Sequence, residues 1–141
     1  MIDRFFGEYR WLSNFWPANV VFDGEVYPTV EHAYQAAKTL DAAERTRIRM
    51  IPGAAAAKRL SRDLTTREDW ADIKLHVMKD LLRQKFAIPE FREKLRATER
   101  EELVEGNNWG DTYWGVCNGT GANHLGKILM ELRDDEQLPL L

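Results

Sequence analysis

The sequence predicts a single α+β domain over residues 1–141, with a mainly helical middle and short strands near both ends. Helix signals cluster in the middle of the chain instead of alternating with strands, which favours α+β over repeated βαβ units. A strong hairpin signal lies near the N-terminus. The length of 141 residues is enough for one hydrophobic core.

The first third of the chain should contain a strand, a hairpin and a helix. Residues 2–6 are expected to form a short strand. The Asp23-Gly24 pair between two short apolar runs predicts a tight hairpin, because both residues tolerate the left-handed backbone that such a turn needs. Thr29 follows a proline and is expected to cap a helix that runs to about Lys38.

The middle of the chain reads as a series of helices. Asp41 and Glu44 form a capping-box pattern. The helices are expected over residues 42–50, 54–60 and 67–86, with another short one from Pro89. The long one is best supported, because its apolar residues recur three to four positions apart.

The last third reads as a loop followed by a helix. The stretch 106–123 holds five of the nine glycines and is predicted to be irregular. Asn123 is expected to cap a final helix that runs to about Arg133 and buries Leu125 and Leu129 on one face.

Composition excludes several classes of protein. The net charge of −3 argues against a generic nucleic-acid coat, although it is compatible with a local basic patch around one nucleotide. One cysteine, Cys117, excludes an internal disulfide framework and a multi-thiolate zinc site. The three histidines are too scattered to predict a metal site. With no visible signal peptide or membrane-length apolar run, we expect a cytoplasmic protein without membrane contact.

Aromatic residues in loops predict a site for a flat ligand. Stacking on a ring and bonding to its edge require aromatic side chains interleaved with amides and hydroxyls. Two loops have this mixture, and their candidate binding residues are Ser13, Asn14, Phe15, Trp109, Gly110 and Trp114. The alternative is ordinary turn chemistry with aromatic core anchors.

The helix expected after Thr29 carries a second candidate set. Glu31, Tyr34, Gln35 and Lys38 are spaced i, i+3, i+4 and i+7 and therefore share one face. The opposite side, with Ala33, Ala36, Ala37 and Leu40, is expected to pack. The polar face could line a pocket or be a solvated stripe.

A third candidate feature is the turn from Gly119 through Gly121 to Asn123. Exposed backbone N–H groups before a helix suit a phosphate. The alternative is a common glycine-rich turn.

Taken together, the chain resembles the NADAR family, which includes N-glycosidases. The matching segments follow in order from about residue 6 to residue 133: Ser13-Asn14-Phe15, Pro28-Thr29-x-Glu31-His32-x-Tyr34-Gln35-Ala36-x-Lys38, Asp69-Trp70, Leu82-Arg83-x-Lys85-Phe86, Asp111-x-Tyr113-Trp114-Gly115 and Gly119-x-Gly121-x-Asn123. An ordered set of this length is far more specific than any one motif.

The resemblance implies a compact α+β fold and hydrolysis of an N-glycosidic bond. Family activities include removal of ADP-ribose from guanine and cleavage of a phosphoribosylamino-pyrimidine intermediate of riboflavin synthesis. Some members act as antitoxins beside a DNA ADP-ribosyltransferase toxin. By similarity, Glu31, Trp70 and Asp111 are active-site positions, and Lys38 lies on the same motif helix.

The candidate residues permit two chemical routes, neither of which requires a metal or another cofactor. Glu31 or Asp111 could stabilise charge at the anomeric carbon or activate water. Lys38 could instead attack that carbon of an opened ribose and form a Schiff base, if burial lowers its pKa. We expect an enzyme that acts on ADP-ribosylated guanine in nucleic acid, DNA or RNA. The alternatives are an enzyme acting on the nucleotide-like riboflavin intermediate and a non-catalytic module that binds ADP-ribose or NAD.

Overall fold

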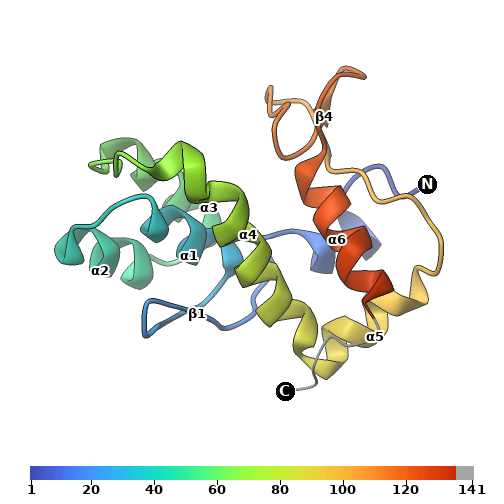
Figure 1. Cartoon of the computed structure of the whole chain (residues 1–141), viewed down its shortest axis with the longest axis horizontal. Coiled ribbons are helices and arrows are strands. Elements are labelled where there is room, and N and C mark those ends of the chain that lie inside the picture. The colour runs from blue at the N-terminus through green and yellow to red at the C-terminus, as the bar shows by residue number, and fades with distance from the viewer. Residues whose placement is uncertain (136–141) are drawn as a thin grey trace. The chain divides into compact units, whose positions relative to one another are not determined.

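The computed structural model describes residues 1–135, and its helices and short strands confirm the α+β class. The chain forms two compact units, which we call the central unit (residues 14–85) and the terminal unit (residues 1–13 and 86–135). Figure 1 shows their elements. Within residues 1–135, no helix is long and apolar enough to cross a membrane.

The central unit begins with the predicted hairpin. Strands β1 (Val20–Phe22) and β2 (Glu25–Tyr27) pair antiparallel. Asp23 and Gly24 occupy the turn with φ of +50° and +83°. This left-handed conformation is what the Asp-Gly pair predicts.

Three helices follow within the central unit, with the predicted caps. They are α1 (Val30–Ala37), α2 (Ala42–Met50) and α3 (Ala54–Leu60), which a short 3-10 turn, η2 (Ser61–Asp63), extends. The Thr29 hydroxyl accepts the His32 N–H at 2.9 Å, and Asp41 Oδ1 accepts the Glu44 N–H at 2.9 Å. Both bonds satisfy N–H groups that a helix start leaves unpaired.

The long helix α4 spans Trp70–Ala87 and starts later than the predicted residue 67. The Arg67 N–H donates to the Lys38 carbonyl at 2.7 Å, and Thr66 pairs with Thr39 in an antiparallel bridge. The Arg67 side chain also holds Asp69 by ion pairing at 2.6 Å. The two contacts with residues 38 and 39 are tertiary and the ion pair is local, and together they hold the segment before Trp70 outside the helix.

The terminal unit contains the remaining elements: η1 (Gly7–Leu12), α5 (Pro89–Ala97), β3 (Gly106–Asn107), β4 (Val116–Cys117) and α6 (His124–Asp134). Helices α5 and α6 are in contact (Figure 1). Their apolar faces are buried, including Phe91 and Leu95 on α5 and Leu125 and Leu129 on α6, as their spacing predicts.

Two predictions for the terminal unit are wrong. Residues 2–6 make only a single parallel bridge, between Ile2 and Leu103, and the chain bends at Phe5 and Phe6 instead of continuing along a partner. The stretch 106–123 is not wholly irregular, since β3 and β4 pair in parallel within it.

Asn123 lies at the N-cap position of α6, as predicted, but the expected side-chain cap is absent. Its backbone is left-handed, with φ of +53°, and its side chain makes no capping bond to α6. The amide instead accepts the Glu105 N–H and donates to the Leu103 carbonyl, each at 3.0 Å. Asn123 therefore ties the start of α6 to the segment before β3.

Small residues allow α1 to approach its neighbours closely. Ala33, Ala36 and Ala37 have no exposed surface, and α1 contacts α2 and α3 (Figure 1). The expectation that Leu40 shares this packing is wrong, because Leu40 lies beyond the end of α1 and is 69% exposed.

We predict that Ala36→Leu lowers the free energy of unfolding by about 1–3 kcal/mol, because a close-packed site must move to admit three more carbons. The exposed Ala43→Leu on α2 is the matched control and should change it by less than about 0.5 kcal/mol. Urea denaturation measures both. Equal effects would contradict the close packing of α1.

Lys85 near the end of α4 is fully buried, and this burial lowers the pKa of its ammonium to about 7. An unfolded chain binds this proton more readily, so unfolding takes up a proton between pH 7 and the ordinary lysine pKa. The contribution of Lys85 to stability is therefore least favourable below pH 7 and improves as the pH rises.

A change from pH 7 to pH 9 should raise the contribution of Lys85 to the free energy of unfolding. We therefore predict that this change raises the free energy of unfolding less in Lys85→Met than in the parent protein. Denaturation in urea at both pH values gives the comparison, with the exposed Arg83→Met as the control. A parent and a Lys85→Met variant with the same pH dependence would show that this lysine is not held in its neutral form.

Candidate active site on helix α1

The polar face of α1 is buried. Glu31, Tyr34 and Gln35 are 7%, 7% and 4% exposed, and Lys38 at the end of the helix is half-buried. A solvated stripe would leave these side chains in water. The structure therefore excludes a solvated stripe, and the lining of a pocket stays a prediction.

Hydrogen bonds connect this face with the preceding loop. Gln35 donates its amide N–H to Glu31 Oε1 at 2.7 Å, and the Glu31 N–H donates to the Asn14 carbonyl at 3.1 Å. The Asn14 amide points its nitrogen at the Met78 sulfur, 3.5 Å away. Asn14 is thereby placed beside Glu31, a neighbour that the loop sequence did not predict.

Two buried acceptors on this face lack a hydrogen-bond donor. They are Asn14 Oδ1 and Gln35 Oε1, neither of which has a partner among the described residues. An unsatisfied buried acceptor carries a desolvation cost, which a ligand hydroxyl or N–H could relieve.

One aromatic ring, that of Tyr34, lies beside the Lys38 ammonium. Its Nζ lies 5.4 Å from the centroid of the Tyr34 ring, and that ring lies 5.1 Å from the ring of Trp70. Burial here lowers the pKa of Lys38 below the ordinary lysine value, and this is the largest influence on it. A lowered pKa places more of the amine in the neutral, nucleophilic form at neutral pH.

Three charged neighbours adjust this pKa further. The Glu31 carboxylate raises the pKa of Lys38, whereas the positive charges of Lys58 and Lys74 lower it. Sequence reasoning missed Lys58 and Lys74. Nothing in their local sequence distinguishes them from solvated lysines, because α3 and α4 bring them near Lys38 only in the folded unit.

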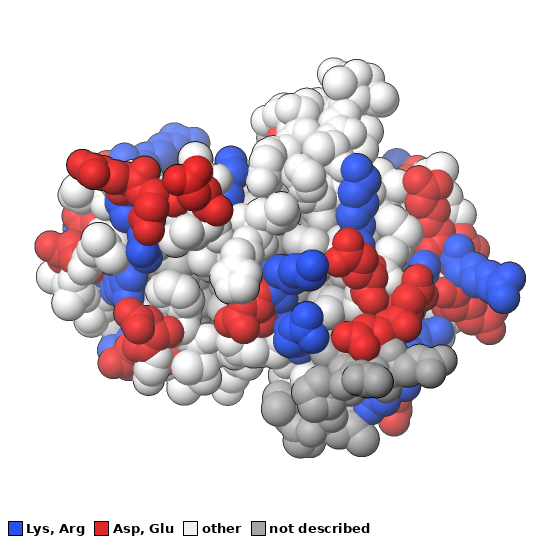
Figure 2. All heavy atoms as spheres, viewed as in Figure 1, with Lys and Arg blue, Asp and Glu red and all other residues white. Residues whose placement is uncertain are grey.

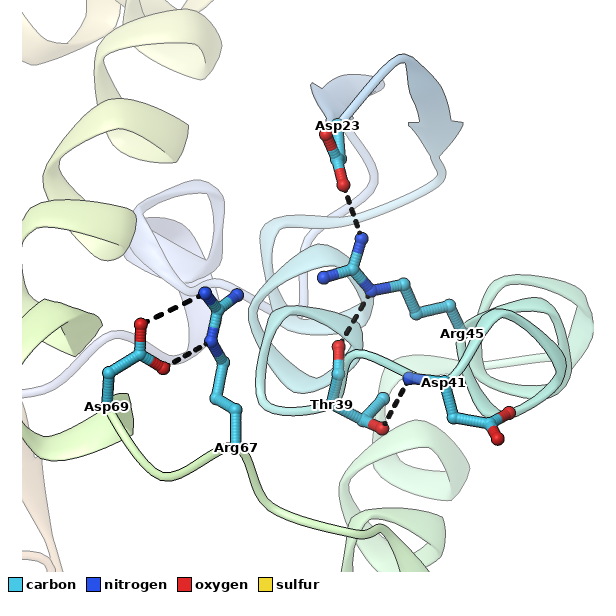
Figure 3. A network of polar contacts seen from close by, with 6 residues as sticks. All are labelled: Asp23, Thr39, Asp41, Arg45, Arg67 and Asp69. Carbon is cyan, nitrogen blue, oxygen red and sulfur yellow. Dashed lines mark hydrogen bonds and ion pairs between the residues drawn. The ribbon is translucent and has the colours of Figure 1, made fainter.

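A polar network fixes the backbone directly after Lys38 (Figure 3). Arg45 donates Nε–H to the Thr39 carbonyl at 2.8 Å and pairs with Asp23 at 2.7 Å. The Asp41 N–H donates to the Thr39 hydroxyl at 3.1 Å. Thr39 is fully buried, so these bonds hold the residue that follows Lys38 in one position.

The other candidate residues belong to the terminal unit, apart from Phe15. Asn107 closes the 107–111 loop with two bonds, donating to the Asp111 carbonyl at 2.9 Å and accepting the Asp111 N–H at 3.0 Å. Asp111 Oδ1 accepts the N–H groups of Tyr113 and Trp114 at 3.1 and 2.9 Å. One oxygen of this proposed catalytic carboxylate thus stabilises the turn.

The two tryptophans predicted to stack on a ligand lie in different surroundings. Trp109, beside the exposed Gly110, is 49% exposed and contacts Phe6 edge-on at 6.2 Å. Trp114 is half-buried, and its ring packs on Tyr113 at 4.7 Å. Trp109 is therefore the better placed of the two for a ligand within the terminal unit.

The expected phosphate site loses most of its donors. The N–H groups of Asn123, His124 and Leu125 already donate to the carbonyls of residues 115, 113 and 114. Gly119 and Gly121 remain exposed, both with positive φ. The start of α6 is thus tied to the preceding loop, and phosphate binding there stays a prediction.

The structure groups the candidates into two sets. The central unit brings together Asn14, Glu31, Tyr34, Gln35, Lys38 and Trp70, with Phe15 41% exposed in the same unit. The terminal unit holds Ser13 and the residues from Trp109 to Asn123. Among residues 1–135, no three His, Cys, Asp or Glu side chains gather as a metal site would require.

The face drawn in Figure 2 carries charges of both signs. Lysine, arginine, aspartate and glutamate side chains lie among broad uncharged areas, in keeping with the net charge of −3. A broad phosphate-binding surface would need a continuous area of positive charge.

The protein thus has an α+β fold in which helix α1 carries the buried carboxylate of Glu31 and ends at the desolvated Lys38. The chain belongs to the NADAR domain family, which it matches over residues 4–136. It is 42% identical over 133 residues to the N-glycosidase YbiA of Escherichia coli, covering 90% of this chain and 81% of that protein. The solved NMR structure of E. coli YbiA superimposes with a TM-score of 0.81 at 39% identity, covering 95% of this chain and 85% of that one.

A riboflavin biosynthesis protein of Vibrio vulnificus is also similar. It is 38% identical over 130 residues, which cover 89% of this chain but 35% of that longer protein. An N-glycosidase of Nostoc punctiforme is 37% identical over 134 residues, and this match covers 85% of that protein.

We predict opposite shifts of the Lys38 pKa in two variants. Glu31→Gln removes the charge that favours the ammonium and should lower the pKa of Lys38, whereas Lys74→Gln removes a repelling charge and should raise it. The measurement is the pH at which reductive methylation of Lys38 reaches half its maximum rate, followed by peptide mass spectrometry.

The exposed Lys127 serves as the internal reference, and its midpoint should stay constant in both variants. If Lys38 titrates at the same pH in all three proteins, these groups do not control its ionisation.

Proposed function

We propose that this protein hydrolyses the N-glycosidic bond between ADP-ribose and guanine in modified nucleic acid. The observation that carries the proposal is the desolvated Lys38 amine on the same helix as the buried Glu31 carboxylate. The N-glycosidase names of the relatives support hydrolysis of a glycosidic bond.

The proposed reaction starts from the neutral Lys38 amine. Its Nζ forms a bond to C1 of the ribose as the bond from C1 to the base breaks, and the base leaves with a proton. Opening of the sugar ring gives a Schiff base between Nζ and C1. Water then adds to C1, which releases the sugar aldehyde and restores the amine.

Glu31 is the proposed proton-transfer group for these steps. Residues seven positions apart on a helix are separated by about 10 Å along its axis. This separation lets the carboxylate and the amine approach a ribose from different ends. Asn14 Oδ1 and Gln35 Oε1 offer acceptors for sugar hydroxyls.

A second substrate of the same class is a phosphoribosylamino-pyrimidine of riboflavin synthesis. The similarity to the riboflavin biosynthesis protein of V. vulnificus favours it. Its reacting bond also joins a nitrogen to C1 of a ribose, so the same residues would act on it.

The experiment compares both substrates with one product analysis. The protein is incubated with DNA carrying ADP-ribosylated guanine and, separately, with the pyrimidine intermediate, and mass spectrometry identifies the released base and sugar. We predict release of ADP-ribose from the DNA, with at least a hundredfold loss in Lys38→Ala and an unchanged rate in the exposed Lys127→Ala.

Each other outcome has a definite meaning. Turnover of the pyrimidine alone assigns the second substrate. Binding of ADP-ribose without release of a base from either substrate contradicts an enzyme and identifies a non-catalytic reader.

A further inference from the structure

The terminal unit contains an open groove that includes Trp109 and none of the residues to which the proposed reaction assigns a chemical step. Its volume is about 570 Å³, within the range of small-ligand sites. Three segments build it: the N-terminal residues up to Phe6, the chain from Val104 to Trp109, and β4 with the turn at Gly119.

The frame of the groove is held by backbone contacts. The Ile2 N–H donates to the Glu102 carbonyl at 2.8 Å, and the Val104 N–H donates to the Ile2 carbonyl at 2.9 Å. Gly106 lies so close to the N-terminal segment that a Cβ there would overlap the Asp3 carbonyl. Any side chain at position 106 would push the two segments apart, and the groove is therefore preformed.

Two exposed aromatic rings meet in this groove. Phe6 and Trp109 are 55% and 49% exposed, and their ring planes stand 74° apart at 6.2 Å. The clamp from Asn107 to Asp111 fixes the short loop that carries Trp109. A flat ring that lies on one of these side chains meets the other edge-on, which is a favoured aromatic geometry.

Polar groups complete the lining. The amide of Asn108 is exposed beside Trp109 and can bond to the edge of a base. Arg4 contributes a guanidinium, whose ion pair with Asp3 has a length of 3.7 Å and is exposed on both sides. Such pairs contribute little free energy, so a phosphate could replace the carboxylate as the partner of Arg4.

We propose that this groove binds a nucleotide, with its base on Trp109 and Phe6 and its phosphate on Arg4. An aromatic platform, an amide and a guanidinium are the groups that base stacking, base-edge bonding and phosphate binding require. The nucleotide is either free in solution or part of a single strand. This inference goes beyond the glycosidase reaction and does not depend on Lys38.

The experiment measures binding by isothermal titration with AMP, ADP-ribose and a short single-stranded oligodeoxynucleotide. It uses the full chain carrying Lys38→Ala, so that turnover does not interfere. Trp109→Ala should weaken binding by about five- to a hundredfold, the range for loss of one stacked base. Met50→Ala, an exposed apolar residue in the central unit, is the control and should bind as the parent does.

Charge variants in the groove give opposite predictions. Arg4→Gln should weaken binding. It should also reduce the slope of log K against log salt concentration by about the amount that one phosphate contact contributes. Asp3→Asn should tighten binding, because it removes a carboxylate that competes for Arg4. Arg47→Gln on α2 is the control for a simple change of net charge.

The three probes distinguish the source of the nucleotide. Groove-dependent binding of AMP and ADP-ribose alone assigns a free nucleotide, and groove-dependent binding of the oligonucleotide assigns a strand. The inference is overturned if no probe binds, or if Trp109→Ala and Arg4→Gln bind every probe as the control variants do. Either result leaves the product analysis with unsubstituted protein unaffected.

Discussion

The central unit depends on one constraint, which is the burial of the polar face of α1. Burying an amine and a carboxylate is costly unless other groups compensate. Here the Gln35 amide bonds to Glu31, the Tyr34 ring lies near Lys38 and packs on Trp70, and the network around Thr39 fixes the backbone that follows. The same burial that costs stability lowers the pKa of Lys38, as the proposed reaction requires of its nucleophile.

Local signals predicted most of the secondary structure, because the responsible interactions are local. Thr29 and Asp41 cap the helices that their positions indicate, and Asp23-Gly24 turns the hairpin. The predictions that were wrong depend on contacts between distant segments. Arg67 bonds to Lys38 and delays α4, and Asn123 reaches Leu103 instead of capping α6.

The candidate site was partly predictable for the same reason. The spacing of Glu31 and Lys38 is a local property of a helix, but their burial depends on what packs against it. Lys58 and Lys74 influence Lys38 only through tertiary structure. The groove beside Trp109 was not predicted, because Arg4 and Phe6 reach it through contacts between Ile2 and the segment before β3. In an extended segment, alternation places Arg4 and Phe6 on one side and Phe5 on the other, and this was the available signal.

The central claim is that the Lys38 amine becomes covalently attached to C1 of the sugar. Borohydride reduction during turnover of ADP-ribosylated DNA tests it most directly, because it converts a Schiff base into a stable amine. The account predicts that peptide mass spectrometry finds the reduced ADP-ribosyl adduct on Lys38, and none on Lys58 or Lys74. Full turnover without an adduct on Lys38, together with full activity of Lys38→Ala, would contradict it and assign the reaction to carboxylate-activated water.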